Sequence, residues 1–189
     1  RMGPDTGVPP YVAAQRRTAD AGAGLLPPPR PPGGGGLLPA FVDGPDNNPI
    51  STAEDVFLHL INNARRSVHI TTPYLAIDEP MRQALCSAGD SGVDVRLLLP
   101  GIPDHKFAYL AAQSHYGELL VHRVKIYIYE PGLLHGKTVL SDGEAAFVGS
   151  VNMDYRSFQL HFECGTVLYG VPAIEGLAED IQRITDCSR

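Results

Sequence analysis

The sequence predicts an α/β domain built on a largely parallel β-sheet flanked by helices. β-branched, apolar segments of strand length alternate with amphipathic segments of helix length through the middle of the chain. Hydrophobic residues make up 43% of the 189 residues, which is enough for one domain with a sizeable core. A single layered domain, preceded by a stretch that does not fold with it, is therefore expected.

Pro, Gly and Ala dominate the first 36 residues. This stretch contains a Pro-rich run at residues 27–32 and consecutive glycines at 33–36. Such a composition buries too little apolar surface to offset the conformational entropy lost on folding. Residues 1–36 are therefore predicted to be a linker or disordered, and residues 37–189 to form the folded domain.

The first predicted helix covers residues 51–64. Ser51 or Thr52 can cap its N-terminus, and Glu54 and Asp55 lie in the first turn, where the helix dipole favours acidic residues. The apolar positions recur at helical spacing and form one face: Val56, Phe57, Leu60, Ile61 and Ala64.

Strands and helices then alternate along the chain. Runs of β-branched and aliphatic residues predict strands at 67–71, 93–99 and 124–129, and helical patterns lie between them at 79–88 and 106–120. Strands joined by a helix-length connection pair in parallel, which is why a largely parallel sheet is expected.

The last predicted strands lie closer together. Residues 133–140 and 145–150 read as adjacent strands that turn at 141–143, and residues 165–169 read as one more strand. A final helix is predicted from residue 173 to about residue 185.

Charge and cysteine content exclude some classes of protein. The formal net charge of -6 disfavours a surface that binds nucleic-acid phosphates, so no nucleic-acid partner is expected. Cys86, Cys164 and Cys187 lack metal-binding spacing and are odd in number, which favours a reducing compartment. No apolar run approaches the roughly 20 residues of a membrane span, so membrane contact is expected to be peripheral or to use sequence outside this chain.

His135 and Lys137 are the first candidate catalytic residues. Residues two apart on a strand face the same side, so the predicted strand places an imidazole beside a fixed positive charge. This pair suits phosphoryl transfer, because the imidazole can attack phosphorus or protonate a leaving oxygen while Lys stabilises the charge on the other oxygens. Ser150 and Asn152 add donors for the same oxygens. No metal or other cofactor is required.

The spacing of these residues is more specific than the pair alone. His135, Lys137, Asp142, Gly149, Ser150 and Asn152 follow the pattern HxK, four residues, Asp, six residues, GSxN. This pattern resembles the signature of the phospholipase D superfamily. The flanking residues, from Asn152 to Phe158 and at Leu160 and Phe162, are similar to the C-terminal repeat of cardiolipin synthases, and the resemblance extends over residues 41–189.

The resemblance implies a phospholipase D-like layered fold and a two-step exchange. A histidine attacks the phosphate of phosphatidylglycerol to form a phosphohistidine, which the glycerol hydroxyl of a second phosphatidylglycerol then displaces. The family assigns the nucleophile to the first motif, so His135 is expected to act as general acid and base. Glu163 resembles the acidic residue that orients the catalytic imidazole, and Asp142 resembles the motif Asp, expected to give structural or orienting support.

The remaining histidines show no metal-ligand spacing and are expected to be ordinary surface or supporting residues: His69, His105, His115, His122 and His161. His161 stands where many members of this family carry Asn. The hydrogen bonds around the motif are therefore not predicted from the resemblance.

Only one such repeat is present, whereas the family's synthases contain two. The chain is therefore expected either to be a fragment that works with a second repeat, or to form a homodimer that brings two copies of His135 together. Three functions stay open: a lipid phosphatidyltransferase half at the cytoplasmic side of the cell membrane, a single-motif homodimeric phosphodiesterase or nuclease, and a catalytically silent half. The acidic balance disfavours the second, and the intact motif disfavours the third.

Overall fold

The structure is a computed structural model that describes residues 36–45, 51–102 and 104–189. Except for Gly36, the predicted linker at residues 1–36 lies outside the described residues. The linker therefore stays a prediction.

A seven-stranded sheet forms the centre of the described domain, with the strand order β1-β9-β7-β6-β2-β4-β5. The strands are β1 (Ala40–Asp43), β2 (Ser67–Thr71), β4 (Asp94–Pro100), β5 (Lys125–Tyr129), β6 (Thr138–Ser141), β7 (Ala145–Gly149) and β9 (Glu163–Tyr169). Two short strands, β3 (Leu75–Ala76) and β8 (Met153–Asp154), pair separately.

The predicted α/β architecture is confirmed, but the sheet is mixed rather than largely parallel. β2, β4 and β5 are parallel neighbours, as predicted. The other four neighbouring pairs are antiparallel: β2 with β6, β6 with β7, β7 with β9, and β9 with β1. The physical reason lies in the connections, because helices α3 and α4 join the parallel strands whereas a short turn joins β6 to β7.

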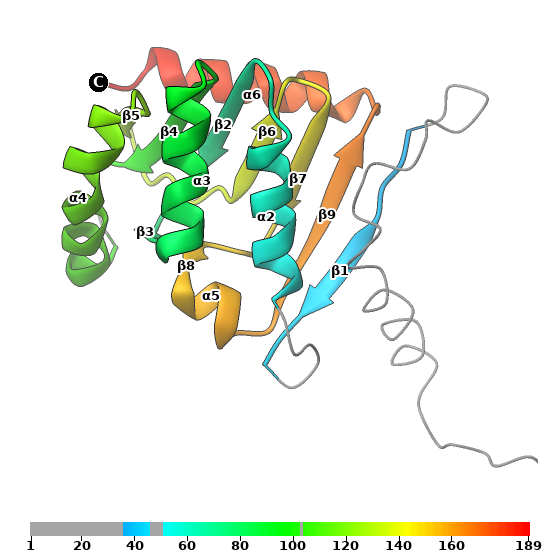
Figure 1. Cartoon of the computed structure of the whole chain (residues 1–189), viewed down its shortest axis with the longest axis horizontal. Helices are drawn as coiled ribbons and strands as arrows, with labels where there is room; N and C mark the ends of the chain where they lie inside the picture. Colours follow the sequence, from blue (N-terminus) through cyan, green and yellow to red (C-terminus); the bar gives the residue numbers. More distant parts are fainter. Residues whose placement is uncertain (1–35, 46–50, 103) are drawn as a thin grey trace, which may run out of the picture.

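Helices cover both faces of the sheet, so the domain has three layers (Figure 1). The helices are α2 (Thr52–Asn62), α3 (Glu79–Asp90), α4 (Lys106–Val121), α5 (Tyr155–Gln159) and α6 (Ala173–Asp186). On one face, α2, α3 and α4 enclose a core with Phe57, Leu85 and Leu119. On the other face, Ile174 and Ile181 of α6 pack against Leu98 and Leu140. Burial of this apolar surface is the main force that holds the layers together.

The first helix begins where the sequence predicts. The Ser51 hydroxyl accepts a hydrogen bond from the backbone N–H of Glu54 at 3.1 Å, which is the expected N-cap. The buried carboxylate of Asp43, at the end of β1, accepts a second one from Ala53 N–H at 2.7 Å. The edge strand β1, which the sequence did not predict, is thereby tied to the start of α2.

The strand predicted at 133–140 begins only at Thr138, because Thr71, the last residue of β2, pairs there. Residues 133–137 therefore approach β6 as an extended loop. Gly136 passes so close to β2 that a Cβ atom there would lie 3.2 Å from Cγ2 of Thr71. The elements β1, β3, β8 and α5 were also missed, and all are short.

Glu54 and Asp78 bring two carboxyl groups together at the N-termini of α2 and α3. Burial, a hydrogen bond with Asp78 and the negative charge of Asp78 raise the pKa of Glu54 from 4.5 to about 7. Gln159 of α5 donates a hydrogen bond to Glu54 at 2.7 Å and partly offsets this rise. Glu54 therefore binds a proton more tightly in the folded state than in the unfolded chain.

Glu54→Gln is expected to remove a pH dependence of stability. A carboxyl group with a raised folded pKa stabilises the fold fully below its unfolded pKa and loses this contribution as pH rises through the folded value, here between 4.5 and about 7. The variant should match the wild type at acidic pH and exceed its free energy of unfolding by on the order of 1 kcal/mol above neutrality, after allowance for solvent screening. Urea denaturation across this range, with the exposed Glu175→Gln as control, measures it. If the free energy of unfolding changes with pH in the same way for the wild type and Glu54→Gln, the raised pKa of Glu54 is contradicted.

Candidate active site

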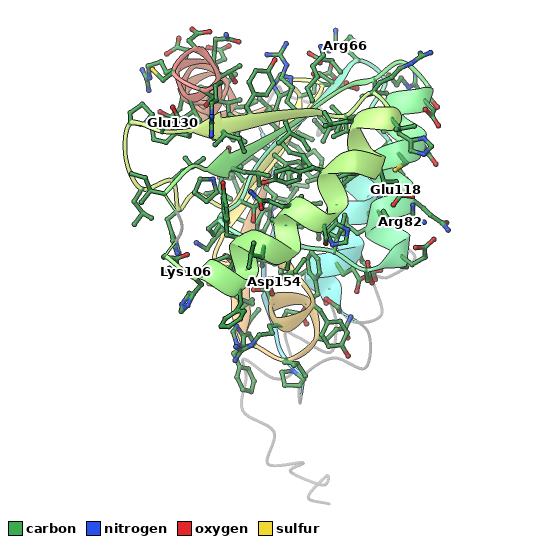
Figure 2. All side chains as sticks on the ribbon, turned by 90° about the vertical axis from the view of Figure 1, so that its left-hand side faces the viewer. Arg66, Arg82, Lys106, Glu118, Glu130 and Asp154 are labelled. Atoms are coloured by element: carbon green, nitrogen blue, oxygen red, sulfur yellow. The ribbon has the colours of Figure 1, made fainter. Side chains whose placement is uncertain are left out.

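Three loops meet at one edge of the sheet. Tyr74 follows β2, Asp104 follows β4, and His135 precedes β6. Because β2 and β4 are parallel while β6 runs antiparallel to β2, the ends of β2 and β4 and the start of β6 lie at the same edge. Figure 2 places Lys106 and Asp154, the labelled neighbours of this edge, at the opposite end of the molecule from Arg66.

His135 and Lys137 are in contact, as predicted, although a loop and not a strand brings them together. Lys137 Nζ donates to the imidazole Nδ1 of His135 at 2.5 Å and to its backbone carbonyl at 2.8 Å. A neutral imidazole that accepts at Nδ1 carries its proton on Nε2. Nε2 faces Asp104, whose Oδ2 lies 3.8 Å away, and the side chain is 46% exposed. The imidazole is therefore reachable from solution.

The surroundings of Lys137 lower the pKa of its side chain. Burial lowers the pKa of its ammonium, and the negative charges of Glu163 and Asp104 only partly restore it. In its protonated form, Lys137 places a positive charge in contact with the imidazole of His135. Such a charge can stabilise the non-bridging oxygens of a phosphate.

Glu163 does not contact the imidazole of His135 among the interactions of the described residues. It accepts a hydrogen bond from the Ser150 hydroxyl and lies 3.6 Å from Nδ1 of His161. Its negative charge acts on Lys137, and its expected role of orienting a catalytic imidazole stays a prediction. Nδ1 of His135 is occupied by Lys137, and Glu163 starts β9, where it pairs with Asp43 of β1.

Gly149 allows β7 and β9 to approach closely at the site. A Cβ atom at Gly149 would lie 2.4 Å from the carbonyl oxygen of Cys164 and 2.7 Å from the Cα of Gly165. Its N–H also donates to the Lys137 carbonyl at 3.3 Å. The glycine of the GSxN pattern is therefore required by packing, and it brings Ser150 next to Glu163.

Ser150 and Asn152 are engaged within the protein. The Ser150 hydroxyl accepts from Cys164 N–H at 3.0 Å while it donates to Glu163. The Asn152 amide nitrogen donates to the Ser157 hydroxyl at 3.1 Å, and its buried Oδ1 has no partner among the described residues. Their predicted role in phosphate binding is not tested by these contacts and stays a prediction.

Asp142 lies at the other end of β6 from His135. Its carboxylate accepts hydrogen bonds from the backbone N–H groups of Arg65, Arg66 and Ser67 at 2.7 to 2.9 Å. Burial opposes ionisation, but these backbone donors and the positive charge of Arg66 lower the pKa of Asp142. The motif Asp therefore anchors the β6–β7 turn to the start of β2, consistent with the structural support expected from sequence.

Sequence reasoning missed Tyr74 and Asp104 as site residues. The Tyr74 hydroxyl donates to Asp104 Oδ2 at 2.5 Å, and the Tyr74 ring lies edge-on to the His135 ring at 6.3 Å. Burial, the hydrogen bond to Asp104 and the negative charges of Asp104 and Asp154 raise the pKa of Tyr74 to about 12. Both residues follow the carboxyl ends of parallel strands. Because ligands often bind at that end of a parallel sheet, this position could have indicated them as candidate site residues.

Neither a metal site nor a membrane span emerges from the described parts of the chain. No group of three or more His, Cys, Asp or Glu side chains there could hold a metal ion. None of the described helices is long and apolar enough to cross a bilayer.

The fold is that of the phospholipase D-like proteins. It superposes on Nuc from Salmonella typhimurium, a phospholipase D family member, with a TM-score of 0.68 at 19% identity, over 82% of this chain and 97% of that one. It also matches a phosphatidylserine synthase from Haemophilus influenzae with a TM-score of 0.61 at 18% identity, over 82% of this chain and 40% of that one.

Within that class the chain belongs to a particular family, described as the cardiolipin synthase, PLD-like domain, which matches residues 57–185. A cardiolipin synthase from Clostridium perfringens is 43% identical over 136 residues, covering 72% of this chain and 28% of that protein. Cardiolipin synthase 2 from Bacillus anthracis is 42% identical over 139 residues, covering 74% and 27%. The chain thus spans less than a third of the length of these relatives.

Asp142→Ala is expected to destabilise the fold by about 2 kcal/mol, because three backbone N–H groups lose a charged acceptor. The backbone at Asp142 has φ of 54°, a left-handed conformation that Ala adopts with strain. Asp142→Asn keeps an acceptor oxygen and tolerates this conformation, so it should lose less. Thermal and urea denaturation measure both. Equal stability of Asp142→Ala and wild type would overturn the anchoring role.

Proposed function

We propose that this chain supplies one catalytic half of a phosphatidyltransferase of the cardiolipin synthase type. The observation that carries the proposal is the contact between His135 and Lys137 at an open edge of the sheet, which leaves Nε2 of the imidazole reachable. The names of the relatives support the lipid class of the reaction.

In this proposal His135 acts as general acid and base. A histidine from a second repeat attacks the donor phosphate and forms a phosphohistidine, while His135, protonated on both ring nitrogens, gives its Nε2 proton to the departing glycerol oxygen and becomes neutral. His135 then accepts the proton of the incoming hydroxyl as that oxygen bonds to phosphorus. The Lys137 ammonium stabilises the negative charge on the phosphate oxygens, and Ser150 and Asn152 support them.

The site needs a second histidine, which a second repeat or a second copy of this chain would provide. The donor and the acceptor are proposed to be phosphatidylglycerol. The reaction is placed at the surface of the cell membrane, on its cytoplasmic side, with the protein held peripherally or through sequence outside this chain.

A second candidate is a homodimeric phosphodiesterase with one motif per chain. It is favoured by the match to Nuc, because a domain of this size accounts for 97% of that chain. The net charge of -6 disfavours nucleic acid as its substrate. Oligomeric mass in solution separates a homodimer from a half that awaits another repeat.

The lipid reaction is tested with purified chain and phosphatidylglycerol vesicles, by mass spectrometry of cardiolipin and released glycerol. His135→Asn should lower product formation at least about a hundredfold, because acid and base catalysis is lost. His122→Asn is the matched control, since His122 pairs with Asp90 at the end of α4.

Product that disappears only in His135→Asn supports a site completed by two copies of the chain. If the chain alone gives no product, the assay is repeated with the N-terminal repeat of a relative added. A lack of product in both settings, or an active His135→Asn, would overturn the proposal.

Lys137→Arg is expected to move the alkaline limb of the rate profile to higher pH. Because burial lowers the pKa of Lys137 below 10.5, the wild-type enzyme should lose its ammonium, and with it transfer activity, below the usual pH for lysine. Arginine stays protonated throughout this range. The initial rate of transfer is measured against pH for both proteins, and identical alkaline limbs would exclude Lys137 as the group that titrates.

A further inference from the structure

We propose that Asp104 and Tyr74 form a binding site for the hydroxyl groups of the alcohol that accepts the phosphatidyl group, and that this alcohol is a polyol of the glycerol class. The inference rests on the proposed transfer function and deepens it, because it assigns the acceptor to residues outside the HxK and GSxN pattern.

Geometry places this pair at the reacting nitrogen. Asp104 Oδ2 lies 3.8 Å from Nε2 of His135, on the side of the ring opposite to the Lys137 contact with Nδ1. A distance of 3.8 Å is too long for a direct hydrogen bond. Two neighbouring hydroxyl groups of one ligand, each at the usual hydrogen-bond distance of about 2.8 Å from its own partner atom, match a gap of this length. The carboxylate therefore lies where an alcohol approaching Nε2 would contact it.

The Tyr74 hydroxyl fixes the carboxylate in this position. It donates to Asp104 Oδ2 at 2.5 Å, and its ring borders both His135 and His105, with centroids 6.3 and 6.1 Å away. Because the pKa of Tyr74 is raised to about 12, this donor keeps its proton at physiological pH. Asp104 is an exposed residue, so a ligand can reach it.

Charge selects the kind of ligand that fits here. Although burial opposes ionisation, the hydrogen bond from Tyr74 and the backbone N–H of His105 lower the pKa of Asp104, so its carboxylate is negative. A carboxylate repels phosphate oxygens but accepts hydrogen bonds from hydroxyl groups. The positive Lys137 lies on the Nδ1 side. The charges beside the two ring nitrogens thus differ in sign. The positive charge near Nδ1 suits a phosphate, and the negative charge near Nε2 suits a neutral alcohol.

This arrangement favours an alcohol with two or more hydroxyl groups. Once Nε2 of His135 has given its proton to the departing glycerol, one hydroxyl of the acceptor donates to Nε2 and reacts. Its oxygen bonds to phosphorus, its proton moves to Nε2, and the bond between phosphorus and the histidine of the second repeat breaks. A second hydroxyl donates to Asp104. A simple monohydric alcohol or water can make the first contact but lacks the second.

Binding is tested without turnover, by saturation-transfer difference NMR of the whole chain with glycerol as the probe and 1-propanol for comparison. The wild type should saturate glycerol in preference to 1-propanol. Asp104→Asn should weaken the glycerol signal roughly tenfold, because a charged acceptor is lost at nearly constant shape. Tyr74→Phe should weaken it less. Asp180→Asn, an exposed α6 residue paired with Arg183, is the control.

A second measurement uses turnover in an active assembly, formed by the chain alone or with an added N-terminal repeat. The ratio of cardiolipin formed to phosphatidic acid released by water should fall roughly tenfold in Asp104→Asn, because only the polyol uses the carboxylate. A residue that merely holds the imidazole would lower both products together and leave this ratio unchanged.

The outcomes separate this inference from the proposed function. Glycerol saturation that depends on Asp104, without any transfer in either assembly, supports the subsite and overturns the transferase proposal. Transfer by the wild type with an unchanged ratio and an unchanged glycerol signal in Asp104→Asn supports the transferase and overturns the subsite.

Discussion

The pairing of β6 with β2 is the constraint on which the site depends. Thr138 pairs with Thr71, the last residue of β2, so the chain that enters β6 must cross the end of β2. That crossing places His135 and Lys137 beside the loops that leave the parallel strands β2 and β4. His135 and Lys137 therefore lie where strands of opposite direction are neighbours, and the hydrophobic core beneath holds that edge in place.

The polar groups around His135 divide the site by charge. Lys137 occupies one ring nitrogen and Asp104 faces the other. Glu163 is nearly buried, and its carboxylate is held by Ser150 while its charge acts on Lys137. An imidazole between a cation and an anion can exchange protons on one side while the phosphate charge is held on the other.

Local signals in the sequence predicted much of the fold, but they could not predict contacts made by distant segments. The strand at 67–71 and the cap at Ser51 follow from β-branched residues and helix-capping chemistry, which act over a few neighbouring positions. The sequence also predicted that His135 and Lys137 lie together, and their side chains are in contact. Tyr74 and Asp104 stand 30 residues apart and meet only because β2 and β4 are adjacent. The turn at 141–143 did indicate the β6–β7 hairpin. Strand order is set by tertiary packing, so neither the contact of Tyr74 with Asp104 nor the antiparallel pairing of β6 with β2 could be inferred from local pattern.

The β6–β7 hairpin explains the spacing of the residues in the sequence signature. The four residues between Lys137 and Asp142 are β6 itself, and the six before Gly149 are the turn and most of β7. Adding one residue to β6 would turn every later side chain of that strand to the opposite face. It would also move Asp142 away from the backbone of residues 65–67. The intervals between the residues of the signature thus fix the lengths of β6 and β7. Insertions within these intervals should therefore be far rarer in evolution than substitutions there.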